Sequence, residues 1–164
     1  MPKFVTGLDC AWHQAKGGLM IALMVLVFDQ LSKQWVVHNF DLYQSIPVMP
    51  FFNLTYLRNT GAAFSLLSEA GGWQKWLFSG LAIGVSIGLV IYLARLPVQQ
   101  RLLRWSIALV LGGAVGNLID RLCYGYVIDF LDVYYRTWHW PAFNIADSAI
   151  SVGVFLMFVD SFRK

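Results

Sequence analysis

The chain has 164 residues, of which 58% are hydrophobic, 16% aromatic and only 13% charged. Soluble domains carry about a quarter charged residues, so this composition excludes an ordinary soluble domain and predicts a protein surrounded largely by lipid. The net charge of +3 does not indicate a nucleic-acid binder, because the basic residues are scattered between apolar runs and form no patch.

The first apolar run, residues 17–37, has the length of a membrane span. It is too long for the hydrophobic region of a cleavable signal peptide, and no small-residue cleavage pattern follows it, so it predicts a retained helix. In the segment after it, the alternating stretch 53–57 lies between prolines and a Gly-Gly pair. This pattern predicts a small sheet, followed by a short interfacial helix around Gly72–Trp76.

Three further apolar runs follow, at about 76–94, 102–119 and 144–162. The run at 76–94 has no charged residue, and its glycines at four-residue spacing are expected to let another helix approach closely. These glycines are Gly80, Gly84 and Gly88. The run at 102–119 is expected to end in a Gly-Asn-rich turn. The pattern predicts an all-α membrane protein, a single membrane-embedded domain over 1–164 with four transmembrane helices.

Positive charge predicts the orientation, because basic residues concentrate on the cytoplasmic side of a membrane protein. They precede the first span, fill the loop between the second and third, and close the chain: Lys3, Lys16, Arg95, Arg101, Arg104, Arg163 and Lys164. Both termini are therefore expected to be cytoplasmic, with the segments of about 38–75 and 120–143 outside. Cys10 and Cys123 then lie on opposite sides of the membrane, which excludes a disulfide between them.

Acidic residues within or beside a span need a reason, because each costs about 2.5–3.5 kcal/mol on insertion scales. Asp160 precedes Arg163 by three residues, which predicts an interfacial ion pair. Asp29 precedes Lys33 by four, which predicts an ion pair within the first span. The alternative for Asp29 is a supporting role, in which it accepts hydrogen bonds from an outer segment.

Asn117, Asp120 and Arg121 lie close together at the end of the third span. One interpretation is that Asp120 and Arg121 cap the helix, pair with each other and anchor it at the interface. The other is that Arg121 stays there because an anionic group approaches, with Asn117 and Arg121 holding a substrate backbone or head group.

Asp129 and Asp147 have no basic residue three or four positions away. A helix N-terminus is an alternative explanation for Asp147, but Asp129 has apolar flanks and no helix start. We therefore expect the two carboxyl groups to face each other at the outer end of the bundle and share a proton. One ionised and one protonated carboxyl supply a base and an acid, as in aspartic peptidases.

Other hydrolytic centres lack support in the sequence. No HExxH or GxSxG motif is present, and His13, His38 and His139 are not spaced as metal ligands. Ser32 and Lys33 are adjacent on a helix and point about 100° apart, which disfavours a Ser–Lys dyad. No metal and no cofactor are expected.

Five motifs in this order resemble those of the bacterial lipoprotein signal peptidase (signal peptidase II) family. They are FDQLSK (28–33), RNTGAAFS (58–65), GGAVGNLIDR (112–121), VIDF (127–130) and FNIADS (143–148). The resemblance covers nearly the whole chain except the part before residue 17. It implies four transmembrane helices in the bacterial inner membrane, an extracytoplasmic β-cradle and a surface helix.

The resemblance also implies the activity: an aspartic endopeptidase that removes signal peptides from prolipoproteins whose cleavage-site cysteine carries a diacylglyceryl group. Its catalytic pair corresponds to Asp129 and Asp147. The supporting residues correspond to Asp29, Asn59, Asn117, Asp120, Arg121 and Asn144, of which Asn117 and Arg121 are expected to contact substrate. Lipidated prolipoprotein and membrane phospholipid are the expected partners of a monomeric enzyme, with the active site at the periplasmic face.

Two other functions were considered. A small proton-coupled transporter or channel subunit also pairs acids across a bundle, but transport sites lie near the membrane midplane and these acids lie toward one face. A non-catalytic lipid-binding scaffold explains Arg121 but gives no reason for Asp129.

Overall fold

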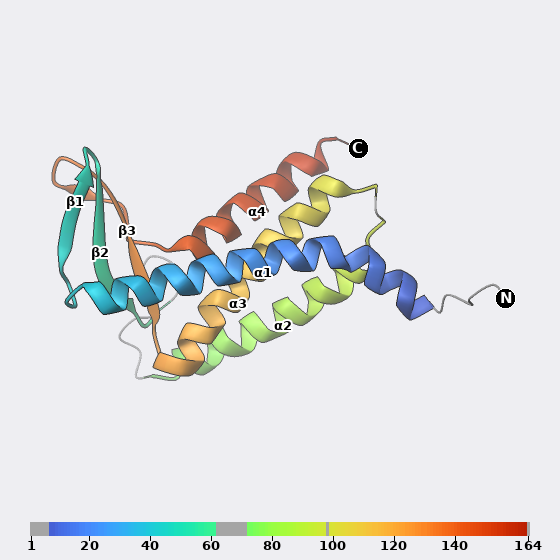
Figure 1. The fold of residues 1–164 in the computed structure, drawn as a ribbon, viewed down its shortest axis with the longest axis horizontal. Coiled ribbons are helices and arrows are strands. Elements are labelled where there is room, and N and C mark those ends of the chain that lie inside the picture. Colours follow the sequence, from blue (N-terminus) through green and yellow to red (C-terminus); the bar gives the residue numbers. More distant parts are fainter. Residues whose placement is uncertain (1–6, 62–71, 98, 164) are drawn as a thin grey trace.

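The computed structural model describes residues 7–61, 72–97 and 99–163. In these residues a bundle of helices carries a small sheet at one end (Figure 1). The helices are α1 (Gly7–Asn39), α2 (Gln74–Arg95), α3 (Arg101–Tyr124) and α4 (Ile145–Ser161), and the strands are β1 (Ser45–Met49), β2 (Phe52–Asn59), β3 (Val127–Tyr135) and β4 (Trp138–His139). The N-terminal end of α1 and the C-terminal end of α4 both lie at the end of the bundle away from the sheet (Figure 1).

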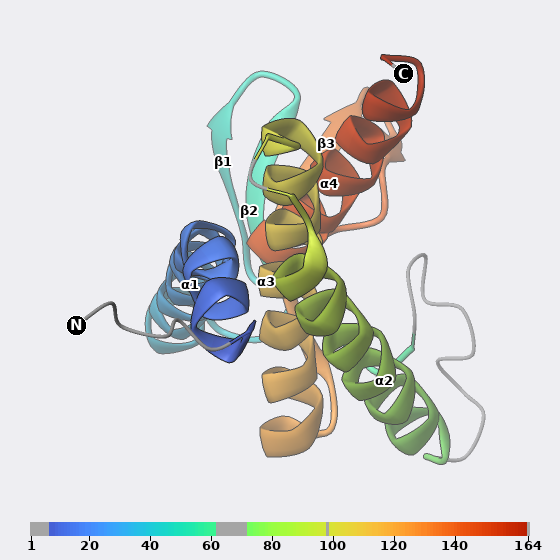
Figure 2. The same cartoon turned by 90° about the vertical axis from the view of Figure 1, so that its right-hand side faces the viewer.

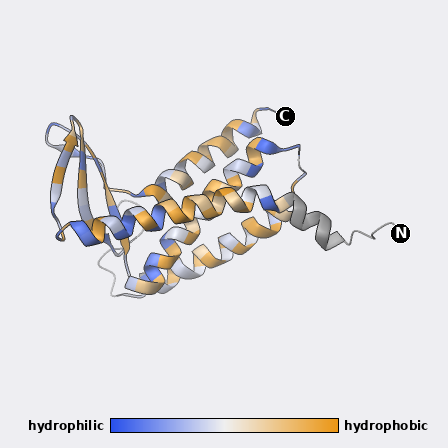
Figure 3. Cartoon of the chain, in the orientation of Figure 1, coloured by the Kyte–Doolittle hydropathy of each residue, from blue (hydrophilic) through white to orange (hydrophobic). Residues whose placement is uncertain are grey.

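Three of the described helices are long and apolar enough to cross a membrane, over Ala15–Asn39, Lys75–Arg95 and Arg101–Tyr124. Hydrophobic residues predominate along the bundle in Figure 3. Helix α4 has 17 residues, which at 1.5 Å per residue gives about 26 Å, slightly less than the ~30 Å of a hydrocarbon core. A fourth span is therefore a prediction that the helix length alone does not establish.

The third helix is longer than the sequence predicted. It continues through Gly116 and Asn117 to Tyr124, so the expected turn at these two residues is wrong. The helix ends at Gly125, which has a φ of +84° and whose N–H bonds the carbonyl oxygen of Arg121 at 3.1 Å. Glycine adopts this left-handed backbone without a steric penalty, and it ends helices for that reason.

Close helix approach depends on glycines of α3 and α4. A Cβ atom at Gly112 would lie 2.6 Å from the carbonyl oxygen of Ala22 in α1, and one at Gly153 would lie 2.7 Å from that of Ser106. A Cβ at Gly113 would meet the backbone of Ala146 in α4. The backbone of α3 therefore approaches the backbones of α1 and α4 closely. Figure 2 shows α3 between these two helices.

The expectation for the glycines of α2 was wrong. A Cβ atom at Gly80, Gly84 or Gly88 would meet no described atom within 4 Å, so this stripe faces away from the bundle. Helix α2 packs instead through a face whose residues recur every seven positions and are 2%, 9% and 0% exposed: Ser79, Ser86 and Leu93. Spacing alone predicted a stripe but not the direction in which it points.

Two local expectations also need correction. Gln74–Trp76 form the first turn of α2 and not a separate interfacial helix, because α2 runs without a break from Gln74 to Arg95; residues 62–71 lie outside the described part. The described Asp160 and Arg163 are joined by a backbone hydrogen bond (3.1 Å) and form no side-chain ion pair. Helix α4 ends at Ser161, so Arg163 lacks the helical geometry that the prediction required.

The expected small sheet is present, with antiparallel strands in the order β1-β2-β3-β4. Strand β3 was not predicted, because its first four residues are all buried and show no alternation. The sheet is seated on the end of α1 by a buried cluster of apolar side chains: Val36, Phe40, Tyr56, Ile128 and Phe130. This packing fixes β3 beside the ends of α3 and α4.

Candidate active site

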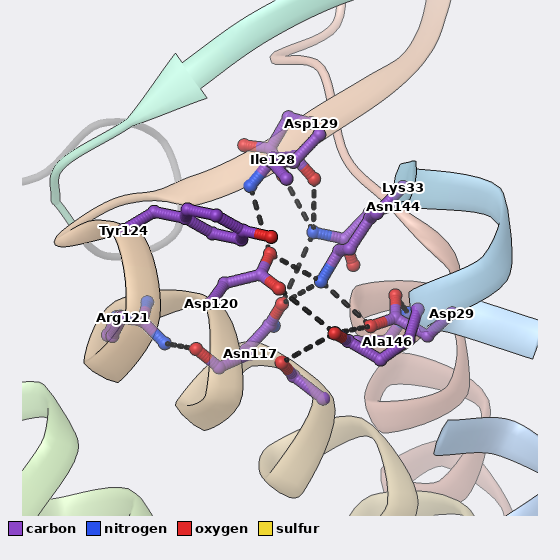
Figure 4. A network of polar contacts seen from close by, with 12 residues as sticks. Asp29, Lys33, Asn117, Asp120, Arg121, Tyr124, Ile128, Asp129, Asn144 and Ala146 are labelled. Carbon is purple, nitrogen blue, oxygen red and sulfur yellow. Dashed lines mark hydrogen bonds and ion pairs between the residues drawn. The ribbon is translucent and has the colours of Figure 1, made fainter. Parts of the chain in front are cut away.

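The eight residues singled out from the sequence come together where α1, α3, the start of α4 and the strands β2 and β3 meet. Figure 4 shows six of them: Asp29, Asn117, Asp120, Arg121, Asp129 and Asn144. Asp29 lies on α1, Asn59 ends β2, and Asp129 lies near the start of β3. The others lie on the last turns of α3 or at the start of α4: Asn117, Asp120, Arg121, Asn144 and Asp147. Residues separated by up to 118 positions thus form one polar centre in a mainly apolar bundle.

Asp129 is buried, with an exposed fraction of 2%. Its Oδ1 accepts a hydrogen bond from Asn144 Nδ2 at 2.7 Å, and its Oδ2 accepts one from Asn59 Nδ2 at 3.0 Å. Neither partner carries a charge, so the carboxyl group is solvated by amides and is not neutralised by a salt bridge. A carboxyl group held in this way can exist in either protonation state.

Asp147 lies in the first turn of α4 and is half-buried. Its Oδ1 accepts a hydrogen bond from Asn117 Nδ2 at 2.7 Å, and its backbone N–H bonds Asn144 Oδ1 at 2.9 Å. Asn144 is therefore the N-cap of α4 and at the same time a donor to Asp129. The cap residue ties the backbone of Asp147 to the side chain of Asp129.

The orientation of each of these asparagines is fixed by a group that can only donate. Asn117 Oδ1 accepts from Lys33 Nζ at 3.0 Å, Asn144 Oδ1 accepts from the N–H of Asp147, and Asn59 Oδ1 accepts from the N–H of Gly61 at 3.0 Å. Since the amide oxygen is committed in each case, the amide nitrogen must face an aspartate. All three asparagines therefore direct N–H groups at Asp129 or Asp147.

Burial, and after it the nearby negative charge of Asp147, raise the pKa of Asp129 to about 7, although hydrogen bonds from Asn59 and Asn144 act to lower it. A carboxyl group with this pKa changes its protonation state near neutral pH. Sharing of a proton between the two carboxyl groups stays a prediction. The two carboxyl groups are connected through asparagines. Asn144 bonds the side chain of Asp129 and the backbone N–H of Asp147, and Asn117 bonds the side chain of Asp147.

Lys33 is at the centre of the network and is completely buried. Its Nζ lies 2.8 Å from Asp29 Oδ2 and 2.9 Å from Asp120 Oδ2, besides the bond to Asn117 (Figure 4). The ion pair expected between Asp29 and Lys33 is confirmed. The counter-charge of Asp120 is Lys33 on α1, so the expected pairing of Asp120 with Arg121 was wrong.

Asp29 and Asp120 each also hold a backbone N–H of the site. Asp29 Oδ1 accepts from Ala146 N at 2.8 Å, and Asp120 Oδ2 accepts from Ile128 N at 3.1 Å. Ala146 directly precedes Asp147 and Ile128 directly precedes Asp129. The two buried carboxylates therefore fix the backbone next to each candidate catalytic residue, although the donor to Asp29 lies in the first turn of α4 and not in the outer segment that was expected.

Arg121 points into a different environment from Asp120. Its guanidinium donates to the carbonyl oxygens of Asn117 and Gly61, both at 3.3 Å, and lies 5.6 Å from the ring centre of Phe78. These contacts leave N–H groups of a five-donor guanidinium available for a further acceptor. An oxygen-rich group entering from the membrane side would meet this charge.

A cavity of about 510 Å³ opens beside the site. Its polar end contains Asn59, Asn117, Arg121 and Asp147, whereas Asp129 does not line it and reaches it only through its partner Asn59. Its apolar part lies between α2, α3 and α4 and is lined by residues that include Phe78, Leu81, Ala82, Val85, Val110, Ala114 and Ile150. The cavity thus joins a polar end at the carboxyl groups to an apolar channel between helices.

Two functional features of the centre were not singled out from the sequence. Lys33 was expected to pair with Asp29, but it also binds Asp120 and Asn117 on α3. Gln30 was not considered, yet its Nε2 bonds Asp120 Oδ1 at 2.9 Å and the carbonyl oxygen of Gly116 at 3.2 Å. Both lie in the FDQLSK stretch, whose density of polar residues inside an apolar span was the available signal.

Comparison with known proteins gives one consistent family. The sequence model of signal peptidase (SPase) II matches residues 21–163. The lipoprotein signal peptidase of Shewanella amazonensis is 56% identical over 143 residues, which is 87% of this chain and 85% of that protein. The lipoprotein signal peptidase of Yersinia enterocolitica is 51% identical over 161 residues, covering 98% of this chain and 90% of that protein.

Solved structures agree with the fold. A bacterial membrane enzyme determined by the in meso method at 2.3 Å superposes with a TM-score of 0.81 at 33% identity, over 90% of this chain and 88% of that chain. A second one, at 1.9 Å, gives a TM-score of 0.76 at 34% identity, over 88% of this chain and 91% of that chain.

Proposed function

The chain belongs to the signal peptidase II family of aspartic peptidases, and from this membership we propose that Asp129 and Asp147 are its catalytic pair. It is a membrane enzyme of the lipoprotein signal peptidase kind. The observation that supports this pair most strongly is the arrangement of amides. Each carboxyl group accepts a hydrogen bond from at least one oriented asparagine, and within residues 7–61, 72–97 and 99–163 neither has a salt-bridge partner.

The proposed reaction divides the work between the two carboxyl groups. Asp147 is the ionised member in this proposal: its Oδ1 accepts an N–H from Asn117 at 2.7 Å, and it removes a proton from a water molecule. Asp129, whose pKa is about 7, is protonated and donates a hydrogen bond to the carbonyl oxygen of the scissile peptide bond. The amides occupy one lone pair on each oxygen of Asp129, so one of these oxygens can still carry the proton that Asp129 donates.

Collapse of the tetrahedral intermediate completes the reaction. Water oxygen forms the new bond to the carbonyl carbon, and the C–N bond of the peptide breaks. The proton taken by Asp147 passes to the leaving nitrogen, and the proton of Asp129 is restored as the carbonyl re-forms. Two carboxyl groups and water supply every proton in this sequence, so the proposal includes no metal and no cofactor.

The proposed substrate is a prolipoprotein whose cleavage-site cysteine carries a diacylglyceryl group. The apolar channel between α2, α3 and α4 suits acyl chains, and the polar end of the cavity suits a peptide backbone, with Asn117 and Arg121 as its contacts. An acyl group held between the helices fixes the depth of the adjacent peptide bond, which then lies at the level of Asp147. Membrane phospholipid occupies the rest of the apolar surface.

The lipid on the substrate is expected to raise cleavage efficiency by about 10²-fold or more, because binding energy from the acyl chains positions the peptide bond. The measurement compares kcat/KM for diacylglyceryl-modified and unmodified precursors in the same detergent. Equal values would remove the lipid channel from the proposal.

A pair of variants sharpens this comparison. Ala114→Phe fills the apolar channel and is expected to raise KM for the modified precursor only. Val152→Phe adds the same ring on α4 at a residue that is 50% exposed and outside the cavity, and it is expected to change neither substrate's kinetics.

Cleavage is expected to fall as pH rises through about 7, because Asp129 then loses the proton that it must donate. The hydrogen bond from Asn59 favours the ionised form and lowers the pKa of Asp129. Asn59→Ala removes that bond, so the pKa rises and the alkaline fall should move to higher pH, whatever the loss in maximal rate. The measurement is a pH profile of kcat/KM for both proteins. If the alkaline fall stays at the same pH in Asn59→Ala, or moves to lower pH, Asp129 is not the group that carries the proton.

For the membrane arrangement we propose four spans in the bacterial inner membrane, with α4 as the fourth. Both ends of the chain are then cytoplasmic, and the sheet and the carboxyl pair lie at the periplasmic face. Two features support this orientation. The sheet lies at the opposite end of the bundle from the N-terminal end of α1 and the C-terminal end of α4 (Figure 1), and the loop between α2 and α3 is basic. The protein is proposed to act as a monomer, since the described residues of one chain supply both carboxyl groups and the cavity.

A further inference from the structure

One wall of the cavity is a continuous segment, residues 140–143, which we call the outer wall: Trp140, Pro141, Ala142 and Phe143. It connects β4 to Asn144, the N-cap of α4, so it directly precedes the site. Its far end is paired with β3, since Phe143 N bonds Leu131 O at 3.1 Å and Leu131 N bonds Phe143 O at 2.8 Å. The position of the outer wall at its other end depends on β4.

Strand β4 has only two residues, Trp138 and His139, and both are exposed. It pairs with β3 through Tyr134 and Tyr135, and Trp140 N adds a bond to Val133 O at 2.8 Å. A strand of this length contributes little pairing of its own and depends on side-chain contacts.

Those contacts are a polar ladder across three strands, made of Asn53 on β2, Asp132 on β3 and His139 on β4. Asn53 Nδ2 donates to Asp132 Oδ2 at 2.9 Å, and His139 Nδ1 lies 2.9 and 3.0 Å from the two oxygens of Asp132. The ring of His139 also stacks on Tyr134, with centroids 5.3 Å apart. The ladder therefore ties β4 to both inner strands of the sheet.

The ladder matters for the position of β4 because Asp132 is largely buried and needs the hydrogen bonds that the ladder supplies. The Asp132 side chain is 9% exposed, and among the described residues its one ion-pair partner is His139. Removing the imidazole leaves a largely buried carboxylate with an amide as its remaining hydrogen-bond donor, which favours a shift of the side chain toward water. Asp132 lies opposite Asn53 in the sheet and bonds His139 diagonally, since His139 itself is opposite Tyr134, so such a shift loosens β4 and the outer wall behind it.

We propose that Asn53, Asp132 and His139 are positioning residues that hold the outer wall in place for substrate binding. This inference rests on the proposed function. The wall lines the end of the cavity near Asp147, so it contacts the peptide part of the substrate and not the acyl chains between the helices. The carboxyl pair is held by Asn59, Asn117 and Asn144, none of which bonds to the ladder. The ladder therefore acts on KM and leaves the chemical step largely unchanged.

The test measures KM and kcat separately with the lipid-modified precursor. His139→Ala and Asp132→Asn are expected to raise KM by about tenfold with kcat within about twofold of the parent value. Asn53→Ala removes one donor but leaves His139, so its increase in KM should be smaller. His38→Ala is the matched control: His38 is an exposed outer histidine whose Nδ1 bonds only the carbonyl oxygen of Gln34, and no change is expected.

His139→Asn provides the conservative rescue. The amide nitrogen of asparagine occupies nearly the place of Nδ1, so it can still donate to Asp132 and should restore much of the lost KM. A KM that stays unchanged in both His139→Ala and Asp132→Asn overturns the inference, provided that each variant melts as the parent does. So does a fall in kcat at constant KM, or a His139→Asn variant no better than His139→Ala.

These outcomes are separate from those of the proposed function. If substitution of Asp129 or Asp147 leaves cleavage intact, the catalytic assignment fails whatever the ladder does. If those substitutions stop cleavage while the ladder variants bind substrate as the parent does, the positioning role alone fails. An Asp132→Asn variant too unstable to assay leaves Asn53→Ala and His139→Asn to decide, since both keep the buried carboxylate paired.

Discussion

Replacing Asp129 or Asp147 by asparagine is expected to reduce cleavage of a lipid-modified precursor by about 10⁴-fold or more, because each change removes one of the two proton-transfer groups. Asparagine has nearly the shape of aspartate, and its oxygen can still accept from Asn144 or Asn117. The folded structure should therefore persist. Cleavage is followed as release of the signal peptide under single-turnover conditions, so that weak residual rates can be measured.

The control for these two variants is Asp41→Asn. Asp41 is an exposed aspartate between α1 and β1, at the end of the bundle that carries the sheet, so its substitution tests the effect of losing one negative charge at that end. Cleavage within about twofold of the parent is expected for it. Substantial cleavage by a correctly inserted Asp129→Asn or Asp147→Asn protein would end the assignment of that residue, and equal melting temperatures exclude loss of folding as the cause of inactivity.

The sequence could identify this pair because the argument depends on local spacing. Asp129 and Asp147 lack a basic residue three or four positions away, and in the structure neither has a salt bridge. Hydropathy is likewise a local property, so three of the predicted spans correspond to helices capable of crossing a membrane. The small sheet was predicted from the alternating residues of 53–57, although burial does not alternate along β2, where Thr55 and Tyr56 are both buried.

Long-range polar contacts were not accessible from the sequence. Asp120 was assigned to Arg121, its neighbour, but its carboxylate bonds Lys33, 87 positions earlier in the chain. Spacing rules describe one helix at a time, and this pair forms only when α1 and α3 pack together. The same limit applies to the ladder of Asn53, Asp132 and His139, whose members come from three strands.

Glycine positions show the limit in another way. The regular stripe of Gly80, Gly84 and Gly88 predicted close packing and faces away from the bundle, whereas Gly113 and Gly153 make the contact between α3 and α4. A glycine permits close approach but does not attract a partner, so its face is decided by the polar groups that must be buried. Here the buried contacts of Lys33 and Asn144 bring α1, α3 and α4 together and leave α2 at the edge of the cavity.

Replacing Lys33 by methionine is expected to impair both folding and cleavage, more than any other single change outside the catalytic pair. It leaves the buried carboxylates of Asp29 and Asp120 side by side without their cation. Removing one partner of a buried ion pair costs about 3–5 kcal/mol of stability, so a much lower melting temperature in detergent is expected. Lys75→Met is the control and should melt as the parent does: Lys75 lies in the first turn of α2, and its Nζ is 5.3 Å from the ring centre of Trp76.

Lys33 also has a positioning role, which a second variant separates from its contribution to stability. Its ammonium group can only donate, so it fixes Asn117 with the amide oxygen inward and the amide nitrogen toward Asp147. Combining Lys33→Met with Asp29→Asn and Asp120→Asn removes all three charges and should recover much of the melting temperature, because no unpaired carboxylate is left buried.

Cleavage by this triple variant should nevertheless stay low, since nothing then holds Asn117 in the orientation that Asp147 requires. If the triple variant regains both stability and the parent rate, Lys33 serves only as a counter-charge. If Lys33→Met alone melts and cleaves as the parent does, the buried ammonium contributes to neither, and the orientation of Asn117 must have another cause. Recovery of stability without recovery of cleavage would place Lys33 in the machinery that keeps Asp147 ionised and correctly directed, one residue away from the reacting atoms.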